Sequence, residues 1–348
     1  MADLGEFELI ERLAECVERA RASRESTWGA TLSVGSGDDA AVTTPRGATA
    51  TSVDALVEGV HFRRGSASPA SVGRKAIAVA LSDLAAMGAE PGEAYVQLGV
   101  SADLDDDYLL ELGAGLADAA AEHGVAVVGG DVTRSPALFL AITVVGHAGS
   151  AADFVLRSGA MSGEALAVTG DLGGAAAGLL LLDRPELSAS VDAAVAEALR
   201  RRHAEPVPRL AAGSTLARAG ATAMIDVSDG LGADAGHVAS ASRARLVVEL
   251  GRVPVQPGVS EVAEAAGADA IELAIGGGDD YELLVAVPRD RLDAARDAVE
   301  NAGTTLSEIG WVEEGEGVAL RAPDGSEREP RGFDQLHAPG GGEPGLAG

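Results

Sequence analysis

The sequence predicts an α/β fold with α+β character, divided into two domains, and three observations lead to this prediction. Short apolar runs alternate with helical stretches along the chain, which is the pattern of α/β proteins. The length of 348 residues suits two domains of about 100–200 residues each. Hydrophobic residues make up 47% of the chain and aromatic residues only 3%, so the predicted cores consist mainly of Ala, Val, Leu and Ile.

The first domain is expected to span residues 1–150. Its clearest helix lies between a start signal at Ser68-Pro69 and a stop at Gly88, and a later helix begins with an acidic turn that suits the helix dipole. The small, loop-like segment Gly149 to Ala152 marks the predicted domain boundary. The expected helices span residues 7–21, 71–87 and 105–123, and the expected strands span residues 48–53, 94–100, 125–128 and 138–146.

The second domain, expected over residues 151–337, repeats the alternation. One of its helices follows Gly230 and ends near Ser242. The other expected helices span residues 174–182, 191–202, 210–219, 260–266 and 289–302, and the expected strands span residues 165–169, 223–227, 246–250 and 281–287. Residues 338–348 are rich in Gly and Pro and are predicted to form a disordered tail.

The composition is strongly acidic. A formal net charge of −28 repels nucleic acid phosphates, so we expect no DNA or RNA partner. Lys75 is the only lysine, and this acidic, lysine-poor, Ala- and Gly-rich composition is typical of proteins from salt-loving or high-GC organisms. Most acidic residues then serve a halophile-like surface. Only acidic residues with a special local context count as evidence for a site.

Other sequence features concern the cellular location. Cys16 is the only cysteine, which excludes an internal disulfide and a multi-cysteine metal site. No run of about 18 apolar residues predicts a membrane span. Residues 1–13 lack the order of charged and apolar residues that a signal peptide has. We therefore expect a cytoplasmic protein without a membrane partner.

Aspartates recur beside Gly or Ser at element ends, or inside an apolar element. An ionised Asp83 within the apolar stretch Ala76–Met87 is costly unless it is paired or bound to a metal. Several carboxylates at one site would repel each other unless cations neutralise them. Oxygen ligands without histidine clusters suit magnesium, which is commonly shared with substrate phosphates. The segments predict a site where several magnesium ions bind a polyphosphate: Gly35–Val42, Ser52–Asp54, Leu81–Leu84, Gly129–Asp131, Asp226–Gly230 and Gly276–Glu282.

Each segment also has a simpler interpretation. Asp-Gly and Gly-Asp turns are common for backbone reasons alone, and for any single turn that explanation outweighs metal binding. Asp83 is the exception because its surroundings are so apolar. The recurrence of such segments along one chain shifts the balance toward a site.

Other residues and turns have two interpretations each. The glycine turn within Val168–Gly174 could present N–H groups to a phosphate or serve close helix–strand packing. The P-loop pattern and the Gly-x-Ser-x-Gly elbow are absent from the sequence. Lys75 could bind a phosphate or lie on the surface. His61 could meet a substrate or be structural. Arg157 could clamp a phosphate or be an ordinary surface arginine.

Taken together and in order, the segments resemble the motifs of the thiamine-monophosphate kinase family. The resemblance extends from about residue 5 to about residue 335, and its specificity lies in the combination of motifs. The wider superfamily includes aminoimidazole ribonucleotide synthetase, selenophosphate synthetase and hydrogenase maturation proteins. The motifs are Gly37–Val42, Asp54–Phe62, Lys75–Ala89, Gly129–Asp131, Asp226–Leu231 and Asp280–Leu283.

The resemblance implies a two-domain, aminoimidazole ribonucleotide synthetase-like fold and a homodimer joined through strands of the N-terminal domain, which would bind ATP and magnesium. It implies an enzyme that transfers the γ-phosphoryl group of ATP in line to the phosphate of thiamine monophosphate, giving thiamine diphosphate. ATP and several magnesium ions would lie between the domains. Since the acceptor phosphate is already ionised near neutral pH, no strong general base is expected.

The resemblance also assigns roles by position. Asp83, Asp131 and Asp229 would act in catalysis. Gly130, Asp131, Arg157 and Ser228 would contact ATP, and His61, Asp279 and Phe333 would line the thiamine monophosphate site. The magnesium ligands would be Asp38, Ser52, Val53 through its carbonyl, Asp54, Asp83, Asp131, Asp226 and Asp229, with Asp39 as a further contributor.

Several positions depart from the family pattern. Val53 replaces Thr, Ala80 replaces Asn, and Asp279 stands where Glu is usual. Gly113 stands where an aromatic residue near the adenine is expected, and Phe333 stands where Trp or Tyr also occurs. These departures bear on substrate geometry more than on metal binding.

Three alternatives stay open: another ATP-dependent enzyme of the superfamily, a non-catalytic divalent-cation-binding protein, and an acidic globular protein with unrelated turns. Selenophosphate synthetase would need a reactive Cys or selenocysteine near its N-terminus, whereas Cys16 falls in a helical pattern. A hydrogenase maturation protein is expected to end with a reactive cysteine, whereas this chain ends in Gly348. Aminoimidazole ribonucleotide synthetase is not excluded by the sequence.

Overall fold

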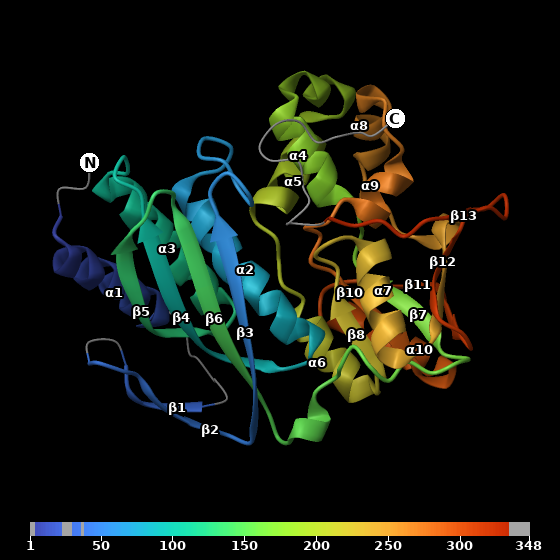
Figure 1. Cartoon of the computed structure of the whole chain (residues 1–348), viewed down its shortest axis with the longest axis horizontal. Coiled ribbons are helices and arrows are strands. Elements are labelled where there is room, and N and C mark those ends of the chain that lie inside the picture. Colours follow the sequence, from blue (N-terminus) through green and yellow to red (C-terminus); the bar gives the residue numbers. More distant parts are fainter. Residues whose placement is uncertain (1–3, 23–29, 36–37, 334–348) are drawn as a thin grey trace. The chain divides into compact units, whose positions relative to one another are not determined.

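The structure is a computed structural model that describes residues 4–22, 30–35 and 38–333. The predicted tail, residues 338–348, lies outside the described residues. The chain divides into two compact units (Figure 1), one formed by residues 1–84 and 89–154 and the other by residues 85–88 and 155–348. None of the helices in the described part of the chain has the length and apolarity needed to cross a membrane.

The first unit is built on a four-stranded sheet of order β3-β6-β4-β5. β4 and β5 are parallel, and the other neighbours are antiparallel. A separate hairpin joins β1 and β2. The elements are α1 Glu6–Ala22, β1 Ala30–Val34, β2 Val42–Pro45, β3 Ala48–Val57, α2 Pro69–Ala86, β4 Glu90–Val100, α3 Asp106–Glu122, β5 Ala126–Arg134 and β6 Phe139–Ala148.

Helices α2 and α3 cover one face of this sheet (Figure 1). In β3, Ala50 and Leu56 are buried while Thr51 and Val53 are exposed, because successive strand residues point to opposite faces. Glycine lets the two helices approach closely. A Cβ on Gly73 of α2 would lie 2.1 Å from the carbonyl oxygen of Leu112 in α3. This contact fixes the position of α2, which carries Asp83.

The second unit has a seven-stranded sheet of order β13-β12-β9-β11-β7-β10-β8, antiparallel except for the β12–β9 pair. Its strands are β7 Ala165–Thr169, β8 Ala223–Asp226, β9 Arg245–Glu249, β10 Leu283–Val287, β11 Leu306–Glu313, β12 Gly317–Arg321 and β13 Glu327–Arg328. Its helices are α4 Gly174–Asp183, α5 Ala193–Ala204, α6 Leu210–Ala219, α7 Leu231–Ser242, α8 Val259–Ala266, α9 Ala270–Gly276 and α10 Leu292–Asn301, and short 3-10 turns cover η1 Ala151–Asp153, η2 Pro185–Ser190, η3 Leu250–Arg252 and η4 Arg289–Arg291.

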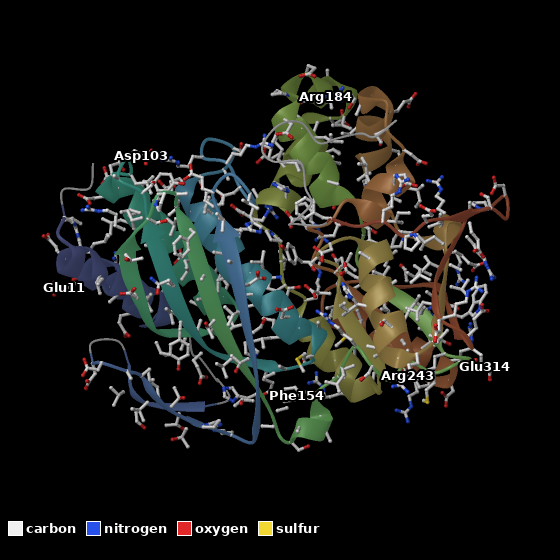
Figure 2. The ribbon with its side chains drawn as sticks, viewed as in Figure 1. Glu11, Asp103, Phe154, Arg184, Arg243 and Glu314 are labelled. Carbon is white, nitrogen blue, oxygen red and sulfur yellow. The ribbon has the colours of Figure 1, made fainter. Side chains whose placement is uncertain are left out.

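Both faces of the second sheet are covered by helices. Leu166 and Val168 of β7 join a core with residues of α7. Ala165 and Ala167 join the opposite core with residues of α6 and α10. A further cluster packs α4, α5 and α8 together. At the end of α7, Arg243 (labelled in Figure 2) adopts a left-handed conformation with φ 52°.

Most predicted elements are present, with two corrections that affect the site. β3 and β5 are longer than predicted, so Ser52–Asp54 lies inside a strand and not at its end, and Gly129–Asp131 lies inside a strand and not in a turn after it. The helix α9 and the strands β1, β2, β11, β12 and β13 have no counterpart among the predicted elements. They are short or rich in Glu, Gly and Thr, so their apolar periodicity is weak.

Candidate active site

In the first unit, the structure brings Asp83 and Ser52 together. Ser52 shares a face of β3 with Leu56 and points toward α2, and its Oγ donates a hydrogen bond to Oδ2 of Asp83. Asp54 lies two residues further along β3, on the same face. Asp83 itself is half-buried between Ser82 and Leu84, which are 0% and 1% exposed. The cost of a carboxylate in an apolar helix is therefore offset by one hydroxyl.

Asp131 does not belong to this cluster within one chain. It lies on β5, where its Oδ2 accepts a hydrogen bond from Nε2 of Gln97 on β4 at 2.8 Å. β5 is three strands away from β3 in the sheet, which corresponds to about 14 Å. Magnesium binds its ligands at about 2.1 Å. One ion cannot join Asp131 to Asp54 or Asp83 of the same chain.

Other predicted residues of the first unit are more dispersed. Asp38 is exposed, and its Oδ1 accepts the N–H of Asp39 at 2.8 Å. Val53 points away from α2 and is 66% exposed. A Cβ on Gly130 of β5 would lie 2.2 Å from the carbonyl oxygen of Val96. Lys75 is only 3% exposed, so its interpretation as a surface lysine is wrong.

His61 has a defined orientation. Its Nδ1 accepts the N–H of Val57 at 3.0 Å. A ring nitrogen that accepts a hydrogen bond carries no proton, so the neutral ring holds its hydrogen on Nε2.

In the second unit, two carboxylate segments form a backbone ladder. The N–H of Val227 donates to the carbonyl of Glu282 at 2.7 Å, and the N–H of Tyr281 donates to the carbonyl of Val227 at 2.8 Å. The N–H of Asp279 donates to the carbonyl of Ser228 at 2.8 Å. The predicted segments Asp226–Gly230 and Gly276–Glu282 thus meet.

Phe333 reaches the same loop. Its N–H donates to the carbonyl of Asp229 at 2.9 Å, and its side chain is 49% exposed. Asp279 has a positive φ of 60°, its Oδ1 accepts from the Tyr281 hydroxyl at 3.0 Å, and its Oδ2 lies 3.6 Å from Nδ1 of His203. Two predicted substrate residues, Asp279 and Phe333, therefore attach to the loop that carries predicted magnesium and ATP ligands.

Three carboxylates gather around this loop. The pKa of Asp234 is raised from 3.8 to about 8, mainly by burial and next by the negative charges of Asp226 and Asp229. Hydrogen bonds from backbone N–H groups act in the opposite direction and lower it. Ligand atoms of Asp229, Asp234 and His237 lie within 4.8 Å of one another. Crowded oxygens that repel each other are the donor set that a hard divalent cation neutralises. The residues present therefore fit magnesium.

Asp280 occupies the N-terminus of α4. Its Oδ2 accepts the N–H of Gly173 at 2.7 Å, and its Oδ1 accepts the N–H of Ala175 at 3.2 Å. The glycine turn at Val168–Gly174 could have presented such groups to a phosphate. The structure instead gives these two donors to an internal carboxylate, which a helix N-terminus also favours.

The buried Asp280 carboxyl makes stability depend on pH. Burial raises its pKa from 3.8 to about 7, although the charge of Arg202 and the hydrogen bonds from the two N–H groups lower the pKa. A raised folded-state pKa gives a stabilising contribution that is present below 3.8 and lost as pH rises through about 7. We expect urea denaturation from pH 5 to pH 8 to show wild type losing stability relative to Asp280→Asn. A constant difference between the two proteins across this range would contradict the assignment.

Glu282 forms the most buried ion cluster of the site. It is 0% exposed, and it accepts hydrogen bonds from Arg202, from Thr169 Oγ1 at 2.7 Å, and from Nε of Arg209 at 2.7 Å. Arg202 also donates to the carbonyl of Asp280 at 2.8 Å. The cluster joins β7, α5 and the start of β10.

Arg157 is not part of this buried ion cluster. It is exposed, and its carbonyl accepts a hydrogen bond from Ser242 Oγ at 3.1 Å. The role of Asp234 was not predicted, and neither were those of Glu282 and its arginines. Asp234 had a usable signal, because it is an acidic residue in the first turn of an apolar helix, as Asp83 is an acidic residue in α2. The arginines had none, since their partners lie 73 to 80 residues away.

Two known domain families match this chain. The AIR synthase related protein N-terminal domain matches residues 37–148, and the corresponding C-terminal domain matches residues 162–322. The thiamine-monophosphate kinase of Mycobacterium tuberculosis (strain ATCC 25618 / H37Rv) is 38% identical over 286 residues, which cover 82% of this chain and 81% of that protein.

Two solved structures align with most of this chain. The crystal structure of thiamine-monophosphate kinase from Stenotrophomonas maltophilia K279a aligns with a TM-score of 0.80 and 34% identity, covering 91% of this chain and 97% of that one. AaThiL complexed with AMPPCP and TMP aligns with a TM-score of 0.72 and 32% identity, covering 95% and 97%.

The two domains and their carboxylate loops define an AIR synthase related protein. Within that class, the sequence identity of 38% over 82% of this chain and 81% of the Mycobacterium tuberculosis protein shows the particular family. The chain belongs to the thiamine-monophosphate kinase family.

Proposed function

We propose that the protein transfers the γ-phosphoryl group of ATP directly to the phosphate of thiamine monophosphate, with magnesium, to give thiamine diphosphate in the cytoplasm. The observation that carries this proposal is the convergence on one loop. Ser228 and Asp229 of that loop are bonded through their carbonyls to Asp279 and Phe333. Predicted ATP, metal and substrate residues thus share one scaffold, and the relative AaThiL is complexed with AMPPCP and TMP.

The residues have distinct tasks in this reaction. Donor and acceptor are both anions, so charge repulsion opposes their approach. When bound, magnesium neutralises both phosphates and aligns them. Ser52, Asp54 and Asp83 would hold metal in the first unit, and Asp226 and Asp229 would hold it in the second. His61 would line the thiamine monophosphate site.

Asp131 enters the proposal through a homodimer. β3 and β5 are the two edges of the four-stranded sheet in the described chain, and unpaired edges are ready to pair with another chain. A second copy joined at these edges would bring its β5 beside β3 of the first. Asp131 of one copy would then complete the metal site of Asp54 and Asp83 in the other.

The test is turnover of ATP with thiamine monophosphate, with and without magnesium. We expect thiamine diphosphate to form only when both substrates and magnesium are present. A parallel assay offers the substrate of aminoimidazole ribonucleotide synthetase, and turnover of that substrate alone would overturn the proposal. Magnesium binding in calorimetry without any ATP binding would favour a non-catalytic cation-binding protein.

A further inference from the structure

One buried carboxylate holds the backbone of the loop in the second unit. Asp234 lies in the first turn of α7 and is 2% exposed. Its Oδ2 accepts the N–H groups of three consecutive residues, Ser228, Asp229 and Gly230, each at 3.1 Å. Successive N–H groups that point to one centre form a nest, which binds an anion. Here the acceptor at that centre is a carboxyl oxygen of the same chain.

The backbone donors of the loop can be accounted for one by one. The N–H of Val227 bonds to the carbonyl of Glu282 at 2.7 Å, and the next three bond to Asp234. On the acceptor side, the carbonyls of Val227 and Ser228 are bonded to the segment 279–281. Without Asp234, three neighbouring donors would lose their acceptor, of which Gly230 is buried and Ser228 and Asp229 are half-buried. Buried donors are rarely left unpaired.

We propose that Asp234 is a positioning residue that sets the direction of the Asp226, Ser228 and Asp229 side chains by holding the loop around its carboxylate. It need not touch ATP or metal for this role. The inference about the loop stands on the hydrogen bonds alone. Its consequence for magnesium and ATP rests on the proposed function.

The first test measures the loop directly. We expect backbone amide exchange, followed by NMR, to speed up at least about tenfold at Ser228, Asp229 and Gly230 in Asp234→Ala. The amide of Val227 should stay protected because its acceptor is a backbone carbonyl. Added formate, which fits the space left by the carboxyl group, should slow the exchange again. Unchanged exchange at all three amides in Asp234→Ala overturns the proposal.

The second test measures function against a matched variant. Asp269 caps α9 in the same unit by accepting the N–H of Ile271 at 2.9 Å. Asp269→Ala therefore removes a helix-terminal carboxylate that the proposal does not involve. We expect calorimetric affinity for magnesium–ATP to fall about 10- to 100-fold in Asp234→Ala, the range for residues that orient metal ligands. It should stay unchanged in Asp269→Ala.

Equal affinities in the two variants would overturn the positioning role. A wild-type chain that binds no magnesium–ATP overturns the proposed function, while the exchange measurement still decides whether Asp234 holds the loop. Should Asp234→Ala fail to fold, Asp234→Leu replaces it, because Leu has a similar size and no acceptor oxygen. We expect the same faster exchange at the three amides, and wild-type exchange rates would overturn the proposal.

Discussion

A chain carrying Asp83→Asn and a chain carrying Asp131→Asn should each lose turnover by more than about 100-fold, since even residues that only orient metal ligands are worth 10- to 100-fold. Refolded together, the two inactive chains should regain about a quarter of wild-type turnover, because half of the dimers are mixed and each mixed dimer has one intact site of two. The reason is the spacing within the sheet, which separates β5 from β3 by two intervening strands.

The control is Asp118→Asn, which changes an exposed carboxylate on α3 in the same unit. It should keep wild-type turnover and give no complementation effect. All variants should melt as wild type does without magnesium, because Asn fits the space of Asp. No recovery in the mixture would mean that both residues act within one chain. Full turnover of Asp83→Asn alone would remove Asp83 from the metal site.

Replacing Glu282 by Ala should cause the largest loss of stability in the second unit, about 3–5 kcal/mol in the free energy of unfolding. Glu282 has a 0% exposed side chain, and its arginine partners Arg202 and Arg209 have side chains only 13% and 18% exposed. The change would leave two guanidinium groups without their shared carboxylate in a poorly hydrated place. Urea denaturation with and without the substitution measures the difference.

Glu308 offers a matched comparison because it also bridges two arginines. It accepts from Arg252 at 2.9 Å and from Arg289 at 3.1 Å, but those arginine side chains are 42% and 52% exposed. Solvent screens such pairs, so Glu308→Ala should cost about 0–1 kcal/mol. Equal losses for the two substitutions would show that burial does not govern the Glu282 cluster.

The sequence predicted the elements with strong apolar periodicity and the family to which the chain belongs. Helix α2 is an example, since Ala, Val and Leu surround Asp83 and a glycine follows the helix. The sequence predicted Ser52 at the end of a strand and Asp131 after one, and could not show that both lie in the middle of strands. Gly and Asp are poor strand formers, and only pairing with β4 keeps Gly129–Asp131 extended.

The site shows the same division. Residue types predicted a set of carboxylates, but not which of them are metal ligands and which hold the backbone. Asp280 and Asp229 look alike in sequence, because Asp280 follows a glycine-rich turn and Asp229 precedes Gly230. Asp280 accepts two N–H groups of α4, whereas Asp229 offers its carboxylate beside those of Asp226 and Asp234. Long-range contacts decide between these uses, and no local pattern contains them.

The α4 terminus has a consequence for substrate selection. A helix start with unoccupied amides would attract free phosphate, sulfate or chloride from the surrounding solution. Here Asp280 already fills that place from within the protein. A phosphorylated substrate therefore meets one competing anion-binding site fewer on this protein. We expect inorganic phosphate not to bind at the N-terminus of α4 even when it is abundant.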